Sequence, residues 1–479
     1  MDREAFQTYL GDASRRGEPV PGAFSGAAGG AACGDLVRVS LVLAEGRVRG
    51  AIFDAEGCAA ALAAGAAVAE LAEGRGVAEL GAIGAEDVAD ALGGLGPQGR
   101  HAADLAADAL HRALTAAIRA GEVAAPASSR RVLVAMSGGV DSAVAALLER
   151  EAGNDVVAVT LKLWADQRTD GAKSCCSPQA VLGARGLAHS LGIPHLTMDL
   201  EPEFRAAVVD RFLEGYAAGR TPNPCVRCNG ELRIDAMAEL AERLGAAGLA
   251  TGHYARVVDD GEGPLLGAAA DPAKDQAYML SALAPATLAR LRFPLAGLDK
   301  PRVRELAAAA GLPVATKRES QDLCFLAGEG RRSFLRRHGR LRDREGELVD
   351  RGGRVLGRHR GHHHFTVGQR RGIGVAGPEP LYVLATDASS NRVTVGTRAE
   401  LATERVTVRD AVLHRPAGRV DRVRLRYHAT PLTCRVPDAP PGRHDALEIA
   451  LRESGVAVAP GQTAALMDGE LIVGHATIA

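Results

Sequence analysis

The segment 137–142, with the sequence SGGVDS, has the residue types and spacing needed to bind the phosphates of a nucleotide. It follows an apolar run at 132–134, which is typical of a buried strand, and precedes a helical stretch at 143–151. The two glycines let the backbone turn and direct its N–H groups at an anion, and the N-terminus of the helix favours the same negative charge. The serine hydroxyls can donate hydrogen bonds, and Asp141 can bind Mg²⁺. An ordinary strand-to-helix turn is the alternative interpretation.

The Gly-Lys-Ser/Thr sequence of a Walker A loop is absent, so this is a different kind of phosphate loop. It resembles the PP-loop of the ATP pyrophosphatase superfamily. The resemblance implies that AMP is attached to an oxygen of the substrate and pyrophosphate is released, which prepares the substrate for a nitrogen or sulfur nucleophile. The loop by itself does not distinguish an amide-forming synthetase from a thiolase.

Three cysteines farther along the chain can supply sulfur chemistry. Cys225 and Cys228 form a C-x-x-C motif before a helix-forming stretch at 231–240, and Cys324 follows 96 residues later. A thiol at a helix N-terminus is more acidic and more nucleophilic than an ordinary thiol. Three interpretations stay open: a persulfide exchanged between two cysteines, an iron–sulfur cluster held by three thiolates with one open iron, or a structural zinc site.

Longer motifs resemble the tRNA-specific 2-thiouridylases of the MnmA type, and the resemblance covers residues 131–479 in order. The motifs are GRTPNPCVRCNGELR, ATGHYAR, KDQAYML, FPLAGLDKPRVRELAAAAGLPVATKRESQDLCFL, FTVGQRRGIGV and PGQTAALMDGELIVGHATI. The resemblance implies adenylation of O2 of the wobble uridine in lysine, glutamate and glutamine tRNAs, followed by replacement of that oxygen with sulfur. It also implies a cysteine desulfurase or another sulfur donor as partner.

The resemblance assigns roles to single residues. Contacts to ATP, with Mg²⁺ on the phosphates, are assigned to Ala135, Met136, Ser137, Gly138, Gly139, Val140, Asp141, Ser142, Leu161 and Gly252. Contacts to tRNA are assigned to Asn223, Pro224, His253, Lys274, Asp275, Gln276, Arg426, Tyr427 and Gln462, the first two at the target base. Cys228 corresponds to the nucleophile and Cys324 to its persulfide-bearing partner.

Cys225 departs from many members of the family, which have aspartate at this position. The substitution produces the set of three cysteines expected in members that carry a [4Fe–4S] cluster. We therefore expect Cys225, Cys228 and Cys324 to hold such a cluster, and a persulfide relay is the alternative.

A second set of metal-ligand types lies near the N-terminus. Cys33, Asp35, Cys58 and His101 are ligands suited to Zn²⁺ or a [2Fe–2S] cluster. Residues 1–120 resemble the NifU/IscU-type iron–sulfur scaffold at these positions, but Ala102 replaces the third scaffold cysteine. We expect this region to hold zinc or iron–sulfur and to deliver cluster or sulfur to the other cysteines. The alternative is a degenerate domain that serves for docking.

The strands and helices predicted around these residues indicate a multidomain α/β protein. Strand-like and helical stretches predict an α+β NifU/IscU-like domain over 1–120, and GEVAAPASSR at 121–130 has the composition of a linker. From 131 to 328, strands alternate with helices, which predicts a doubly wound parallel sheet with the ligand at the carboxyl ends of its strands. We expect a small central tRNA-binding domain over 329–398 and an antiparallel β-barrel over 399–479.

The charge of the chain is uneven. The total is −1, yet residues 331–371 contain 13 arginines against four acidic residues, with five histidines besides. Such density predicts a phosphate-binding surface, and a solvated arginine-rich loop is the alternative. For the run His362–His364, phosphate contact or solvation is favoured over metal binding.

Composition limits the remaining classes of function. No run of 18 apolar residues exists and the first ten residues do not read as a signal peptide, so we expect a cytoplasmic protein without membrane or DNA partners. The competing functions are a small-molecule PP-loop ligase or synthetase, and an iron–sulfur carrier with a vestigial ATP site. The ligase would not need three thiols, a basic segment or a terminal barrel, and tRNA-dependent exchange of pyrophosphate into ATP would exclude the carrier.

Overall fold

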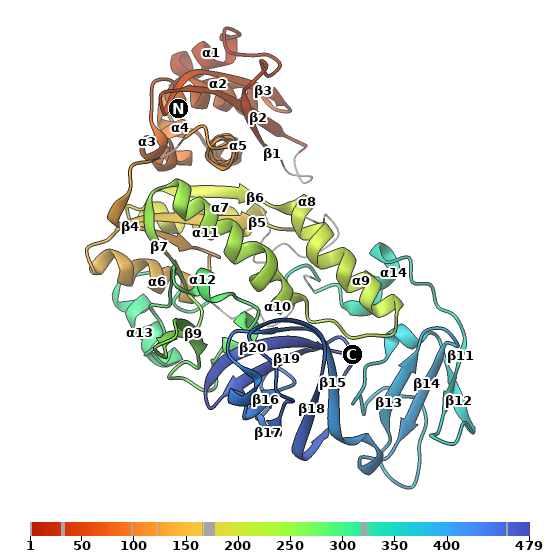
Figure 1. Cartoon of the computed structure of the whole chain (residues 1–479). Helices are drawn as coiled ribbons and strands as arrows, with labels where there is room; N and C mark the ends of the chain where they lie inside the picture. Colours follow the sequence, from red (N-terminus) through yellow and green to blue (C-terminus); the bar gives the residue numbers. More distant parts are fainter. Residues whose placement is uncertain are drawn as a thin grey trace. The chain divides into compact units, whose positions relative to one another are not determined.

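The computed structural model describes residues 2–29, 34–96, 99–123, 125–164, 166, 178–317, 323–326, 328–456 and 458–479. The chain forms two compact units (Figure 1). Unit 1 comprises Met1–Glu201, Ala236–His253 and Arg290–Gly328, and unit 2 comprises Pro202–Asp235, Tyr254–Ala289 and Glu329–Ala479. The predicted α/β multidomain fold is confirmed.

The N-terminal domain of unit 1 is a three-stranded antiparallel sheet with helices. Its strands are β1 (Phe24–Gly29), β2 (Leu36–Ala44) and β3 (Arg47–Glu56), and its helices are α1 (Arg3–Gly11), α2 (Ala59–Ala72), α3 (Val77–Ala82), α4 (Ala85–Ala91) and α5 (Arg100–Ala120). The pattern did not predict α1 or β1. In β1, Gly26 lies directly against α5, since a Cβ there would be 2.3 Å from the carbonyl oxygen of Ala109. The small residues of β1 allow close packing against α5, and they lack the alternation of apolar and polar residues by which a strand is predicted.

The PP-loop domain contributes a five-stranded parallel sheet in the order β10-β7-β4-β5-β6. The strands are β4 (Ser128–Ala135), β5 (Asp155–Lys162), β6 (His195–Asp199), β7 (Ala246–Thr251) and β10 (Leu291–Arg292). The helices α6 (Val140–Glu151), α7 (Pro178–Ser190), α11 (Ile234–Arg243) and α13 (Lys300–Ala309) belong to the same domain. The chain order reverses between β4 and β7, and ligands of such sheets bind at this switch point, beyond the carboxyl ends of the strands.

Helix α5 joins the N-terminal domain to the edge strand β6 within unit 1 (Figure 1). The buried carboxylate of Asp108 on α5 accepts hydrogen bonds from Arg112 of the same helix and from Arg185 of α7. Arg112 also donates to the carbonyl oxygen of Ala27 at 2.7 Å and contacts Asp199 at the end of β6 at 3.5 Å. The packing of α5 against the parallel-sheet domain therefore includes buried charged side chains, and the Asp108 carboxylate is paired with two arginines.

Unit 2 contains the central domain and the barrel. The central sheet has the order β12-β11-β14-β13, from β11 (Gly346–Val349), β12 (Val355–His359), β13 (Tyr382–Asp387) and β14 (Arg392–Gly396). The barrel strands are β15 (Ala402–Leu413), β16 (Arg422–Arg424), β17 (Leu432–Arg435), β18 (Gly442–Val456), β19 (Thr463–Asp468) and β20 (Leu471–Ile478). Pairing of β15 with both β18 and β20 closes these six strands into a ring around an aliphatic core.

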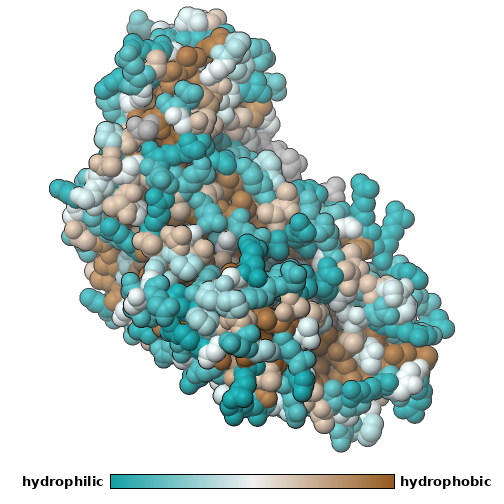
Figure 2. All heavy atoms as spheres, viewed as in Figure 1, coloured by the Kyte–Doolittle hydropathy of each residue, from teal (hydrophilic) through white to brown (hydrophobic). Residues whose placement is uncertain are grey.

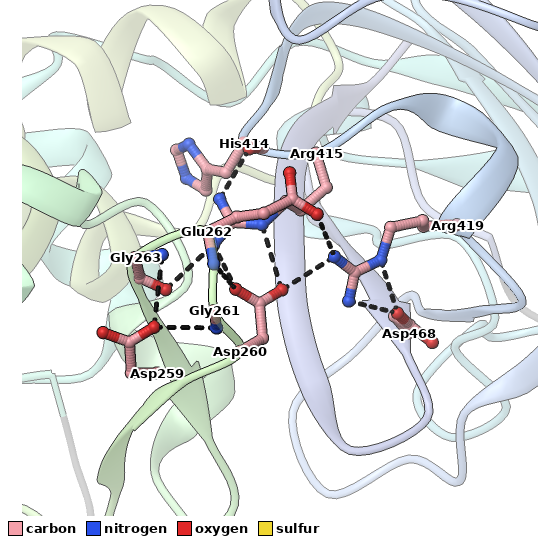
Figure 3. A network of polar contacts seen from close by, with 9 residues as sticks. All are labelled: Asp259, Asp260, Gly261, Glu262, Gly263, His414, Arg415, Arg419 and Asp468. Carbon is pink, nitrogen blue, oxygen red and sulfur yellow. Dashed lines mark hydrogen bonds and ion pairs between the residues drawn. The ribbon is translucent and has the colours of Figure 1, made fainter.

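A hairpin of β8 (Arg256–Asp259) and β9 (Pro264–Gly267) extends the barrel sheet beside β20. Asp260 at its tip accepts hydrogen bonds from Arg415 at 2.7 and 3.0 Å and from Arg419 at 2.7 Å, as Figure 3 shows. Arg419 continues to Asp468 at 2.8 Å. These hydrogen bonds, above all that from Arg415, hold the pKa of Asp260 well below its usual range despite the opposing effect of burial. The network fixes the segment that precedes Lys274 to the barrel.

Unit 2 also carries short helical segments between residues 202 and 289. They are η2 (Arg205–Val209), α9 (Asp210–Ala217), α10 (Pro224–Cys228), η3 (Asn229–Arg233), η4 (Ala277–Leu280) and α12 (Pro285–Leu288), after α8 (Glu201–Phe204). Within the central domain lie α14 (Arg331–His338) and η5 (His362–His364). Helical structure starts at Pro224, so the C-x-x-C motif lies inside a helix and not before one.

In the described part of the chain we find no helix that is both long and apolar enough to cross a membrane. The face drawn in Figure 2 is covered mainly by hydrophilic residues, with hydrophobic side chains scattered among them.

Candidate functional site

The phosphate loop links β4, the middle strand of the parallel sheet, to α6. Gly138 has a φ of +69°, a conformation that glycine adopts without strain. The Ser137 N–H donates to the Ser142 hydroxyl at 3.2 Å, and that hydroxyl donates to the carbonyl oxygen of Gly139 at 3.0 Å. The loop is therefore held in a turn at the start of a helix, the geometry that favours an anion.

Two lysines that the sequence analysis did not identify lie against this loop. The buried Lys300 places its Nζ 2.6 and 2.8 Å from the two carboxylate oxygens of Asp141. Lys317 donates to the carbonyl oxygen of Gly138 at 2.8 Å. Both lie in a motif quoted for the family resemblance, but nothing in their spacing indicates the contact. The loop thus carries two cations suited to phosphate oxygens.

The other residues assigned to the nucleotide surround the same switch point. Gly252 follows β7 and packs on the first turn of α6, since a Cβ there would be 2.7 Å from the backbone of Asp141 and Ser142. Leu161 and Met136 are buried. Thr160 stabilises the start of the loop, because its hydroxyl donates to the carbonyl oxygen of Met136 at 2.8 Å. The assigned ATP residues thus lie in one region of unit 1, and their contacts with ATP stay a prediction.

The two cysteines of the C-x-x-C motif lie three residues apart on α10, so they share one side of the helix. Asn223 caps this helix, since its side chain accepts a hydrogen bond from the Val226 N–H at 3.2 Å, and Pro224 occupies the first turn. Cys228 is buried and Cys225 is partly exposed. The chain therefore presents a paired thiol site directly after the residues assigned to the target base.

Cys324 belongs to unit 1, in a turn that a hydrogen bond from the Leu326 N–H to the carbonyl oxygen of Leu323 closes at 2.9 Å. Phe325 and Leu326 anchor the turn in the core, and Cys324 is partly exposed. The structure brings Cys225 and Cys228 together on one helix. The union of all three thiols in one site stays a prediction.

The loop before α10 is bound to the barrel within unit 2. The Thr221 N–H donates to the carbonyl oxygen of Pro460 at 2.7 Å, and the Gln462 amide donates to the carbonyl oxygen of Thr221 at 2.7 Å. Tyr278 donates to the carbonyl oxygen of Thr463 at 2.8 Å. Burial raises the pKa of Tyr278 to about 12, against the smaller opposing effect of its hydrogen bond to Asn223. The target-base loop is therefore set by the barrel.

Two more residues assigned to tRNA have side chains engaged inside the protein. The buried Asp275 accepts a hydrogen bond from Arg424 at 2.9 Å, and Gln276 accepts one from the Tyr254 N–H at 3.0 Å. The neighbouring Lys274 is partly exposed. In unit 1, the His253 ring lies 2.9 Å from the hydroxyl of Thr251. Direct tRNA contact of all four assigned residues stays a prediction.

A cavity of about 290 Å³ opens beside the target-base loop. It is lined by Thr221, Thr366, Val367, Gly368, Gln369, Leu425, Arg426, Ala459 and Gln462. Arg426 is exposed, and the ring of Tyr427 stacks on that of Tyr278 with centroids 6.1 Å apart. The guanidinium of Arg426 at the cavity wall is suited to an unstacked base of single-stranded RNA.

The candidate metal ligands of the N-terminal domain converge on Asp35. Its buried carboxylate lies 2.6 Å from the His101 ring nitrogen and accepts hydrogen bonds from the Cys58 thiol at 3.2 Å and the Cys58 N–H at 2.8 Å. Burial raises the pKa of Asp35, but the hydrogen bonds from His101 and Cys58 outweigh it and the pKa is lowered.

One ligand atom from each of Asp35, Cys58 and His101 lies within 4.8 Å of the others, and this donor set fits Zn²⁺. Ala102 is fully buried on α5. Cys33 lies outside the described residues.

Four protein-family models match the chain in succession. They are the NifU-like N terminal domain at residues 11–119, the tRNA methyl transferase HUP domain at 130–328, the tRNA methyl transferase PRC-barrel domain at 332–397 and the aminomethyltransferase beta-barrel domain at 412–478.

Curated proteins match over nearly their whole length. The Bifunctional protein NifU/MnmA of Rubrobacter xylanophilus is 48% identical over 467 residues, which cover 95% of this chain and 93% of that protein. The tRNA-specific 2-thiouridylases MnmA of Magnetococcus marinus and Chloroflexus aurantiacus are 42% and 44% identical, over 72% and 73% of this chain and 98% of each relative. The chain therefore belongs to the family of tRNA-specific 2-thiouridylases MnmA, in the bifunctional form that carries a NifU-like domain at its N-terminus.

Proposed function

We propose that this protein replaces O2 of the wobble uridine with sulfur in the tRNAs for lysine, glutamate and glutamine, at the expense of ATP. The observation that carries the proposal is the pair Cys225 and Cys228 on one helix, capped by the residue assigned to the target base, Asn223. A ligase for small molecules does not require such a pair.

In the first step, O2 of the uridine attacks the α-phosphorus of ATP and pyrophosphate leaves. The loop N–H groups, Lys300 and Lys317 neutralise the charge on the phosphates, which favours departure of pyrophosphate. Asp141 would hold Mg²⁺, which would neutralise further negative charge on the phosphates. Lys300 and Asp141 form an ion pair, so the ammonium group and the carboxylate lie in the same part of the site.

In the second step, a sulfur nucleophile attacks C2 of the uridine and AMP leaves with the original oxygen. Cys225, Cys228 and Cys324 would hold a [4Fe–4S] cluster, which would supply the open position for that sulfur. The burial of Cys228 limits the access of water to this part of the site. The wobble base must be unstacked to reach this site, as is usual for single-stranded RNA.

We also propose that the N-terminal domain binds zinc or a [2Fe–2S] cluster and supplies the thiols with sulfur or cluster. The support is the convergence of Asp35, Cys58 and His101. Changing Cys33 and Cys58 to serine should lower the 2-thiouridine content of tRNA in cells, and unchanged thiolation would contradict delivery.

The main test is mass spectrometry of wobble nucleosides from a deletion strain that expresses single variants. Cys225→Ser and Cys228→Ser should abolish 2-thiouridine yet retain tRNA-dependent exchange of pyrophosphate into ATP. Cys434→Ser is the matched control, since Cys434 is buried in barrel strand β17. Exchange that needs a small molecule and no tRNA would favour the ligase, and no exchange at all would favour a carrier with a vestigial ATP site.

Cys225→Asp separates the two sulfur mechanisms, because it restores the residue found in many relatives. A persulfide relay tolerates this change, whereas a cluster held by three cysteines does not. Iron and sulfide analysis after anaerobic purification measures the cluster directly, and a colourless, fully active protein would exclude it.

A further inference from the structure

The histidine run of the central domain is largely buried, which contradicts the expectation that it is a solvated segment. His362 and His363 are 9% and 4% exposed, and the side chain of His364 is 13% exposed. His362 has a structural role, because its ring nitrogens lie 3.2 Å from the Asn391 side-chain oxygen and 3.3 Å from the carbonyl oxygen of Ala217. The other two rings require a separate explanation.

His363 has a buried ring nitrogen, Nε2, with no hydrogen-bond partner in the described part of the chain. Its ring is fixed between two neighbours. A Cβ on Gly361, whose φ is +144°, would be 2.4 Å from the His363 ring, and the ring of His364 lies with its centroid 4.2 Å away. A buried polar atom without a partner is costly, and a metal ion is one of the groups that satisfies it.

Asp343 completes the group from the loop before β11. Its Oδ1 lies 3.1 Å from the His364 ring nitrogen Nε2, and its side chain is 54% exposed. One ligand atom each from Asp343, His363 and His364 lies within 4.8 Å of the other two. Ligand atoms about 2 Å from Zn²⁺ in a tetrahedron lie about 3.3 Å apart, so rotations of the Asp343 and His364 side chains would close this arrangement around one ion beside the fixed His363 ring.

We propose that Asp343, His363 and His364 bind a divalent cation of the Zn²⁺ class, with water as the fourth ligand. Two imidazoles and a carboxylate are ligands that zinc and its neighbours in the first transition row accept, while Mg²⁺ and Ca²⁺ prefer oxygen alone. The ion belongs to neither the three-cysteine site nor the Asp35 site.

The cation would stabilise the loop that borders the cavity beside the target-base loop. Thr366, which lines that cavity, follows His364 by two residues. Arg331 donates to the carbonyl oxygen of His364 at 3.3 Å and to the Thr366 hydroxyl at 3.2 Å, so its guanidinium links the two residues. Metal binding in the central domain would thus determine the shape of the cavity wall.

The test is equilibrium dialysis of the full chain against Zn²⁺, with the bound ions counted. Asp343→Asn and His364→Gln should each weaken one Zn²⁺ site at least about tenfold, since even changes outside the ligand set cost that much. Asp343→Asn folds without difficulty because the residue is on the surface. Asp445→Asn, which changes an exposed aspartate of β18, is the matched control and should bind Zn²⁺ as the unchanged chain does.

Replacing Zn²⁺ with Co²⁺ shows, by its absorption spectrum, which ligands hold the ion that Asp343→Asn no longer binds. The difference spectrum between the unchanged chain and Asp343→Asn should lack the thiolate-to-cobalt charge-transfer band that the cysteine sites produce. The proposal is overturned if Asp343→Asn and His364→Gln bind as much Zn²⁺ as Asp445→Asn with the same affinity, or if the lost ion carries the thiolate band.

Discussion

The side-chain amide of Gln462, in the turn before barrel strand β19, donates a hydrogen bond to the carbonyl oxygen of Thr221, 241 residues earlier in the chain. The next residues after Thr221 are Pro222 and Asn223, which caps the helix of Cys225 and Cys228. The barrel therefore acts on the thiol helix through the backbone of this loop, in addition to any contact with RNA.

Replacing Gln462 with alanine should reduce the rate of thiolation at saturating tRNA about fivefold. A typical hydrogen bond contributes about 1 kcal/mol, which corresponds to that factor. The measurement is steady-state thiolation at varied tRNA concentration, with kcat and KM determined separately. Arg426→Ala, on the exposed edge of the same cavity, should instead raise KM in a salt-dependent manner. A pure KM effect for Gln462→Ala would show that Gln462 acts only on RNA.

Replacing Lys300 with methionine should lower tRNA-dependent pyrophosphate exchange by about 100-fold or more. The change removes a cation beside the phosphates and leaves the Asp141 carboxylate without its partner at 2.6 Å, and loss of one electrostatic contact in an active site commonly costs 10²–10³ in rate. Lys274→Met is the control, because that lysine is assigned to tRNA. Nucleotide affinity without tRNA should fall for Lys300→Met and stay constant for Lys274→Met.

Unit 1 should lose stability in weak acid through three neighbouring histidines, of which His111 on α5 and His195 on β6 are buried and His189 on α7 is partly exposed. The rings of His111, His189 and His195 lie with centroids 5.9–6.4 Å apart. Burial lowers the pKa of each, and Arg185 lowers it further. The other charged groups that face the cluster are Asp108, which favours protonation of His111, and Asp87, which favours that of His189.

The unfolded chain takes up protons near pH 6.5 while the folded chain does not, so stability present at pH 7.5 is lost as the pH falls below about 6.5, by up to about 1.4 kcal/mol per histidine and pH unit. Thermal unfolding at pH values between about 5 and 7.5 measures the slope. His111→Leu should reduce it by about one third, whereas His444→Leu, in the barrel of unit 2, should leave it unchanged. An identical slope for His111→Leu would contradict the assignment.

Asp260→Asn should lower the unfolding temperature of unit 2 by several degrees, because it removes the carboxylate that binds Arg415 and Arg419 (Figure 3). The pKa of Asp260 is lowered in the fold, so its contribution is present above the ordinary aspartate pKa of about 3.9 and is lost as the pH falls below it. Differential scanning calorimetry at neutral pH checks the change. Asp259→Asn, whose carboxylate accepts hydrogen bonds from the Gly261 and Gly263 N–H groups, should have a smaller effect.

Local sequence patterns predicted strands and helices well where a buried face or a glycine turn defines the element. The strand, loop and helix at 128–151 follow from an apolar run, a glycine that takes positive φ and a helical periodicity. The structure places Asp35, Cys58 and His101, which the sequence analysis had grouped as candidate ligands, close together, and their metal binding stays a prediction. In contrast, β1 has small residues without alternation, and the histidine run gave no sign of its burial.

The sequence identified the family and the order of the domains and predicted which groups react, because these inferences depend on motifs of neighbouring residues. Only the tertiary structure decided that Lys300 lies on Asp141, that Gln462 holds Thr221, and that Asp343 meets His363 and His364. Each of these contacts joins residues that the chain order separates. They exist because strand order and domain packing bring distant segments together, and no local periodicity encodes which polar side chains then meet.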